Sequence, residues 1–136
     1  MRQIIFIGLL ICSLSCADKK GKSTTAVVSP MEKVMEAHDV LMPKMGTIRS
    51  LEKQLKEQPD SVRTRLLQDL RGANDAMMLW MEGLGNDFEP EELMSRKALS
   101  EEKLKVLETY IVSVAKLKTQ MESAIENAKK VVDMPE

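Results

Sequence analysis

The chain contains two cysteines, one histidine and few aromatic residues, and these shortages exclude several classes of protein. Both cysteines, Cys12 and Cys16, fall within the first sixteen residues, so residues 17–136 can form neither a disulfide among themselves nor a thiolate metal site. His38 is the only histidine, which excludes a zinc site with two histidine ligands. Any hydrolase with a histidine base would have to use this one residue.

Aromatic residues are equally scarce, since Phe6, Trp80, Phe88 and Tyr110 are the complete set. The core must therefore be built from leucine, valine, isoleucine and methionine. No segment alternates apolar and polar residues with a period of two over a useful length, and glycine and proline fall mostly between periodic segments. These patterns predict an all-α fold.

Neither sign of charge dominates, because 20 lysines and arginines stand against 21 aspartates and glutamates, with a net charge of −1. We therefore expect no nucleic-acid partner. The chain has no glycine-rich phosphate loop and no nucleophile motif. Adjacent carboxylates such as Glu91 and Glu92 would point about 100° apart on a helix, so they do not form a catalytic pair. We expect a protein that is not an enzyme.

The first sixteen residues carry the most informative feature that is present. Arg2 precedes an apolar run at residues 4–11, and small residues then lead to Cys16. The run suits a signal peptide but is too short for the roughly 20 residues of a spanning helix. We interpret residues 1–15 as a lipoprotein signal peptide and Cys16 as the lipidated residue; an ordinary secretory signal or a short uncleaved anchor are the alternatives.

This interpretation places the mature protein in the bacterial cell envelope, on the periplasmic or outer-membrane side. The lipid on Cys16 would attach it to a membrane without crossing it. Residues 16–29 are mainly polar and are predicted to be the lipid anchor and a flexible tether. Residues 30–136 are long enough for one helical domain with a modest core.

Three long helices are predicted within this domain, at about residues 30–57, 61–85 and 101–132. Ser29 and Glu32 form a capping-box pattern at the first start, and Ser100 caps the third. The second and third helices carry apolar residues three and four positions apart. These residues are Val62, Leu66, Leu70, Ala73, Met77, Trp80, Met81 and Leu84, then Leu104, Leu107, Ile111, Val114, Leu117, Met121, Ile125, Ala128 and Val132.

Short connections between these helices predict an antiparallel up-down-up bundle or an elongated coiled coil. A proline inside a helix lacks the N–H that the preceding turn requires, at a cost of about 3 kcal/mol, so we expect the first helix to kink at Pro43. Residues 87–99 contain Pro90, and a short turn of helix from Glu91 is predicted there.

Methionine is unusually frequent, with eleven in the chain. Four of them share one predicted helix face with the histidine, within about 80° of arc. This face consists of Met31, Met35, His38, Met42 and Met45. In a hairpin that turns near Pro59, His38 and Trp80 are equally far from the turn, and Met42 comes level with Met77. We expect the methionines of the two helices to face each other.

Two interpretations of this cluster stay open. Thioethers with an imidazole select copper(I) or silver(I), which predicts a soft-metal site with His38, Met42, Met77 and Met81 as ligands. Trp80 would then cover the cation or pack beside it. Haem held by the histidine and a methionine is a weaker variant. The favoured interpretation is packing alone, because methionine fills irregular gaps around a kink and contacts aromatic rings.

The segments His38–Gly46 (HDVLMPKMG) and Ala73–Met81 (ANDAMMLWM) also carry a family resemblance. The chain resembles, over about residues 1–90, the small helical lipoproteins of Bacteroidota that often bear the label "viral A-type inclusion protein". This resemblance implies an envelope lipoprotein without catalysis. We therefore expect a membrane-anchored protein whose helical domain binds a protein partner, associates with itself or has a structural role, with soft-metal binding as the alternative.

Overall fold

The computed structural model describes residues 29–58 and 60–133, and this part of the chain is helical with no strand. Four α-helices occur in it: α1 (Pro30–Gln54), α2 (Asp60–Asp87), α3 (Pro90–Leu93) and α4 (Glu101–Val132). A short 3-10 helix, η1 (Leu55–Glu57), follows α1. The predicted all-α class is confirmed. The predicted signal peptide and most of the tether lie outside the described residues.

The start of α1 shows why the chain becomes helical at this point. The Ser29 hydroxyl accepts a hydrogen bond from the Glu32 N–H (3.1 Å), and the Glu32 carboxylate accepts one from the Ser29 N–H (2.6 Å). Pro30 occupies the first helical position, where a missing N–H has no cost. The helix then continues through Pro43 to Gln54.

The α2 helix runs past its predicted end. Gly85 was expected to stop it, but the helix continues to Asp87, and the N–H of Phe88 still donates to the carbonyl of Leu84 (3.1 Å). No glycine of the described residues has positive φ, so Gly85 does not take the left-handed conformation that ends many helices. The two additional helical residues bring Phe88 into the core, where it is 3% exposed.

The predicted turn of helix after Pro90 is present as α3, and its first turn repeats the capping pattern of α1. The Glu92 carboxylate accepts a hydrogen bond from the Glu89 N–H at 2.8 Å. Ser95 then adopts a positive φ of 56°, and residues 94–100 lead to α4. Ser100 caps α4 by accepting a hydrogen bond from the Lys103 N–H (3.2 Å).

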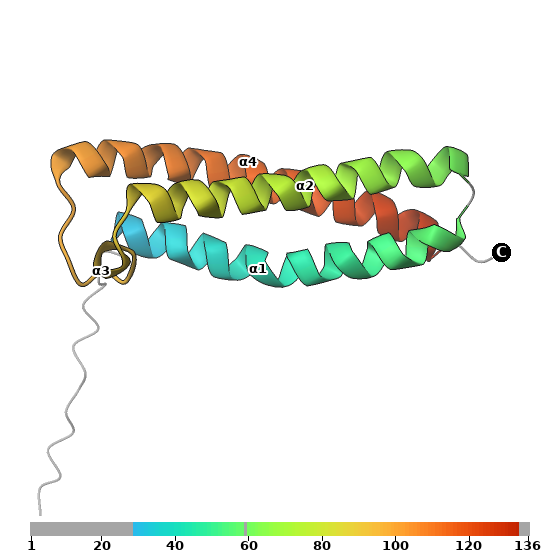
Figure 1. The fold of residues 1–136 in the computed structure, drawn as a ribbon, viewed down its shortest axis with the longest axis horizontal. Helices are drawn as coiled ribbons and strands as arrows, with labels where there is room; N and C mark the ends of the chain where they lie inside the picture. The colour runs from blue at the N-terminus through green and yellow to red at the C-terminus, as the bar shows by residue number, and fades with distance from the viewer. Residues whose placement is uncertain (1–28, 59, 134–136) are drawn as a thin grey trace, which may run out of the picture.

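The three long helices lie side by side, and the chain reverses direction at each connection between them (Figure 1). α4 packs along both α1 and α2, whereas α1 and α2 contact each other less extensively. The start of α1, the short α3 and the start of α4 share one end of the molecule (Figure 1). The connection between α1 and α2 lies at the other end.

Buried residues recur every seven positions along each long helix, which is the spacing with which helices pack side by side over a long distance. The residues with this spacing are Val34, Leu41, Ile48 and Leu55 in α1 and η1; Leu70, Met77 and Leu84 in α2; and Leu107, Val114, Met121 and Ala128 in α4.

No buried side-chain nitrogen or oxygen in the described residues lacks a hydrogen-bond partner.

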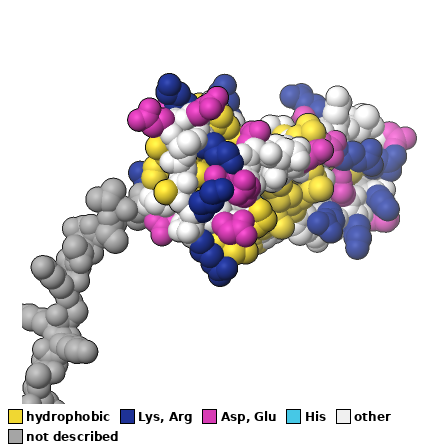
Figure 2. Space-filling model, turned by 60° about the vertical axis from the view of Figure 1, so that its left-hand side comes forward, with side chains coloured by type: hydrophobic (Ala, Val, Ile, Leu, Met, Phe, Trp, Pro, Cys, Tyr) yellow, Lys and Arg dark blue, Asp and Glu magenta, His cyan; other side chains and the backbone are white. Residues whose placement is uncertain are grey.

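The face of the molecule drawn in Figure 2 carries acidic and basic side chains interspersed with one another, with apolar side chains visible between them. Two predicted core positions, Val62 and Leu104, lie at this surface and are 41% and 38% exposed. Both sit near the start of their helices, where fewer neighbours cover them. Within residues 29–58 and 60–133, no helix is long and apolar enough to span a membrane.

Candidate functional site

His38 lies on α1 with its side chain 24% exposed. Its Nδ1 lies 2.9 Å from Oδ1 of Asp39, whose side chain is 76% exposed. In the neutral tautomer that donates Nδ1–H to this carboxylate, Nε2 keeps its lone pair and can ligate a metal. Cys16, the predicted lipidation site, lies outside the described residues.

The three methionines predicted as metal ligands differ in burial. Met77 is fully buried in α2, Met81 is partly buried at the edge of the core, and Met42 is 39% exposed. The buried stripe of α1 includes Leu41, so Met42 lies about 100° away from the middle of that stripe. The face that carries His38 and Met42 is therefore an edge of the core.

Among residues 29–58 and 60–133, no three histidine, cysteine, aspartate or glutamate side chains come close enough together to hold a metal ion. Methionine sulfur is not among these donors.

Trp80 is 8% exposed and packs toward α4. Its Nε1 donates a hydrogen bond to Oγ of Ser113 at 3.2 Å. Its ring meets the edge of Tyr110, with 5.9 Å between centroids and an interplanar angle of 72°. Such pairs contribute about 0.5–1.5 kcal/mol beyond the burial of their area. The structure thus gives Trp80 a packing partner, Tyr110, that the sequence did not indicate.

Tyr110 contacts three residues at or just after the end of α2, namely Gly83, Asp87 and Phe88. Its ring also meets Phe88 edge-on, with 5.9 Å between centroids, and its hydroxyl donates to Oδ2 of Asp87 at 2.6 Å. A Cβ atom at Gly83 would lie 2.7 Å from the Tyr110 hydroxyl oxygen, so the missing side chain of this glycine makes room for the ring. Only the packing of α4 on α2 brings these residues together.

Burial, and secondly the hydrogen bond to Asp87, raise the pKa of Tyr110 to about 12 from an ordinary value of 10.0. Because this is the only tyrosine in the chain, its ionisation can be followed by ultraviolet absorbance at 295 nm without interference from another tyrosine. We expect a midpoint near pH 12 in the folded protein and near 10 in urea. Folding favours the neutral phenol of Tyr110, so its raised pKa stabilises the folded protein below pH 10. This contribution is lost as the pH rises toward 12.

The variant Asp87→Asn is the matched test of the second cause. It removes the carboxylate and keeps the burial, so the midpoint should fall only part of the way toward 10. A folded protein that titrates near pH 10 would show that Tyr110 does not pack as described.

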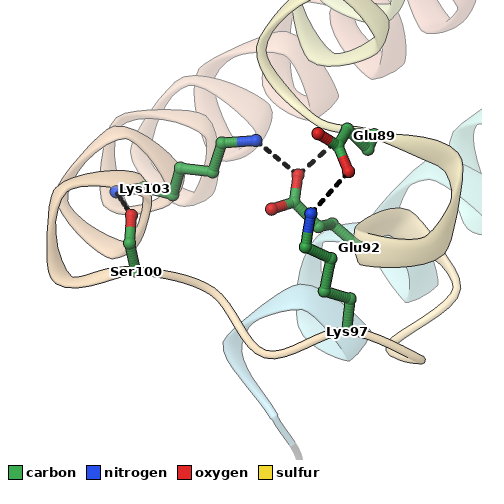
Figure 3. A network of polar contacts seen from close by, with 5 residues as sticks. All are labelled: Glu89, Glu92, Lys97, Ser100 and Lys103. Atoms are coloured by element: carbon green, nitrogen blue, oxygen red, sulfur yellow. Dashed lines mark hydrogen bonds and ion pairs between the residues drawn. The ribbon is translucent and has the colours of Figure 1, made fainter.

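A network of ion pairs joins α3 to the start of α4 (Figure 3). Glu92 is 3% exposed, and its Oε2 accepts hydrogen bonds from the Glu89 N–H (2.8 Å) and from Nζ of Lys103 (2.5 Å). Lys97 donates to the Glu89 carboxylate at 2.7 Å. The Lys103 ammonium also lies 5.7 Å from the centroid of the Phe88 ring. These contacts join α3 and the loop after it to the start of α4 and to Phe88, the residue that follows α2.

The hydrogen bond from Lys103, and secondly the one from the Glu89 N–H, lower the pKa of Glu92 below its ordinary value of 4.5. The hydrogen bond that the Lys97 ammonium donates to the Glu89 carboxylate raises the pKa of Lys97. The sequence contains one usable signal for this site, since Glu89, Pro90 and Glu92 repeat the spacing of the α1 capping box. Nothing in the local sequence indicates Lys103, eleven residues further on.

An apolar groove of about 310 Å³ runs between α1 and α4. Val40, 51% exposed, contributes to it, and charged side chains border it. It is lined by Lys33, Glu36, Ala37, Val40, Leu41, Val114, Ala115 and Lys118.

No protein-family model, curated protein or solved structure matches this chain. The resemblance to Bacteroidota lipoproteins therefore stays a prediction.

Proposed function

We propose that this protein is a lipid-anchored component of the bacterial cell envelope, held on the periplasmic or outer-membrane side by an acylated Cys16. Its helical domain acts as an interaction or structural module and has no catalytic role. The observation that carries this proposal is the N-terminal pattern of Arg2, the apolar run at residues 4–11 and Cys16. The resemblance of residues 1–90 to small Bacteroidota lipoproteins agrees with it.

The position of Ser29 supports a tethered arrangement. Ser29 begins α1 at the end of the molecule that also holds α3, and twelve residues separate it from Cys16. A chain of that length spans at most about 45 Å. We propose that it holds an up-down-up bundle, kinked at Pro43, within this distance of the membrane.

The exposed apolar residues support a role in association with a protein partner or a second copy. Methionine adapts to partners of different shape because its side chain is unbranched and flexible. The surface offers Met42, Met78 and Met94, which are 39%, 51% and 61% exposed, and Leu79, which is 68% exposed.

The substitution Cys16→Ser tests the proposal. We expect it to abolish both metabolic labelling with a fatty acid and cleavage of the signal peptide, because the lipid and the cleavage site depend on the same residue. Cys12→Ser is the matched control and should leave both unchanged. Normal labelling and cleavage of the Cys16→Ser protein would refute the lipoprotein assignment.

A second candidate function is the binding of copper(I) or silver(I), and the contact between His38 and Asp39 favours it. Metal-binding histidines commonly donate one ring N–H to a carboxylate, which orients the ring and makes the other nitrogen more basic. The 2.9 Å contact of Nδ1 with Asp39 would leave Nε2 for the metal. Anaerobic titration with copper(I) against a competing chelator tests this function, and the absence of any binding would refute it.

A further inference from the structure

The faces of α1 and α2 that look toward each other can be identified from an ion pair. Nε of Arg71 on α2 lies 3.6 Å from Oε1 of Glu52 on α1. His38 precedes Glu52 by fourteen residues and Met78 follows Arg71 by seven, so each shares a helix face with one partner of this pair, within about 40°. We call the strip where these faces meet the α1–α2 seam, and define it by His38 and Met42 of α1 and Met78 and Met81 of α2.

The contacts with α4 identify the opposite faces. On α1, Lys44 pairs with Glu122 of α4 at 3.1 Å, and His38 and Met42 lie about 120° and 160° around the helix from Lys44. On α2, Gly83 lies against Tyr110 of α4. Met78 and Met81 lie about 140° and 160° from Gly83. All four seam residues therefore point away from α4.

The same four residues fall at matching levels along the seam. Counted along the sequence from residue 59, between η1 and α2, Met42 and Met78 are 17 and 19 residues away, and His38 and Met81 are 21 and 22 residues away. A helical side chain covers the surface about one position toward the N-terminus of its own Cα. This shift moves the α1 side chains away from the turn and the α2 side chains toward it, so Met42 comes level with Met78, and His38 with Met81 to within about one residue.

Solvent exposure separates these residues from Met77. Met42 and Met78 are 39% and 51% exposed, His38 is 24% exposed at its side chain, and Met81 is partly buried, whereas Met77 is fully buried. An ion from solution can reach the seam without opening the core. Met77 lies behind it, about 100° around α2 from Met78.

We propose that a soft monovalent cation, copper(I) or silver(I), binds at the α1–α2 seam through Nε2 of His38 and the sulfur atoms of Met42, Met78 and Met81. Thioether and imidazole donors select such cations over hard ones, which prefer oxygen. The proposal rests on the second function given above and assigns to Met78 the role that the sequence pattern gave to Met77.

The first test is a copper(I) titration of the full chain in detergent micelles, without oxygen, against a colorimetric chelator. Cys12 and Cys16 are both replaced by serine, because free thiolates would compete for copper(I). We expect one bound ion per chain and a loss of affinity of about tenfold or more for Met78→Leu. Met77→Leu is the matched control, with the same replacement at the neighbouring buried position, and should bind with unchanged affinity.

The second test locates the ion directly. With ¹³C-methyl-labelled methionine, saturation with silver(I) should shift the methyl resonances of Met42, Met78 and Met81, while those of the buried Met45, Met77 and Met121 stay in place. Met78→Leu alters an exposed site, and its circular dichroism spectrum should match that of the parent chain.

The outcomes separate the ligand set from the function. Binding that survives Met78→Leu and is lost in Met77→Leu, or silver(I) shifts confined to the buried methionines, would overturn the seam site and leave metal binding in place. A chain that binds neither copper(I) nor silver(I) would overturn both.

Discussion

Replacing Leu41 with alanine is expected to lower the free energy of unfolding by about 2–5 kcal/mol, whereas the same change at the next residue, Met42, should lower it by less than about 1 kcal/mol. Leu41 is 1% exposed, so its removal leaves a cavity between α1 and its neighbours. Met42 is 39% exposed and loses fewer contacts. Since a domain of this size has a total stability of about 5–15 kcal/mol, Leu41→Ala removes a large share of it.

Urea unfolding, followed by circular dichroism and by the fluorescence of Trp80, measures both values. The comparison controls for helix propensity, because leucine and methionine have similar intrinsic preferences for the helix. Equal losses at the two positions, or a larger loss at Met42, would show that α1 presents a different face to the core.

Replacing Lys103 with methionine is expected to destabilise the protein more than Glu92→Gln does. Lys103→Met leaves the Glu92 carboxylate, 3% exposed, without the ammonium that faces it. Glu92→Gln leaves Lys103 unpaired instead, but that side chain is 32% exposed and can turn toward water. Lys105→Met, at an exposed position two residues further along α4, is the matched control and should have little effect.

The pH dependence of these variants follows from the lowered pKa of Glu92. A carboxyl group with a lowered folded pKa adds stability above its ordinary value of 4.5, and this stability is lost as the pH falls through the folded value. In Lys103→Met the main cause of the lowering is gone, and only the hydrogen bond from the Glu89 N–H and the charge of Lys97 remain to oppose the effect of burial. The difference in melting temperature between the parent and Lys103→Met should therefore shrink as the pH falls below 4.5.

Thermal unfolding of the four proteins at pH 7 and below pH 4.5 checks both statements. A difference between the parent and Lys103→Met that stays constant over this range would mean that Glu92 and Lys103 do not form the pair in Figure 3.

Local chemistry was sufficient to predict the helices and most of their limits. Ser29 with Glu32, and Ser100, satisfy the first free N–H groups of α1 and α4, and such short-range bonds depend only on residues three positions apart. The end of α2 was predicted less well, because Gly85 permits a helix to end without requiring it. The burial of Phe88 depends on the helix continuing to Asp87, and this gain comes from residues distant in sequence.

The predicted face of α1 overlaps the observed buried stripe only in part, since Met31 and Met45 are buried but Met42 is 39% exposed. Val34, Leu41 and Ile48 occupy the middle of the buried stripe. The predicted face and the buried stripe follow the same helical period and differ by a rotation around the helix. Which of the two faces inward depends on where α4 packs.

By itself, the sequence determined the all-α class, the approximate helix limits and the apolar stripes of α2 and α4, because caps and periodicity are local properties of the chain. The tertiary structure decided that Trp80 packs on Tyr110, that Lys103 pairs with a buried Glu92 and that Met42 lies at an edge while Met77 is enclosed. Each of these depends on how α4 lies against the first two helices. That placement depends on apolar residues of all three helices together, so no single segment encodes it.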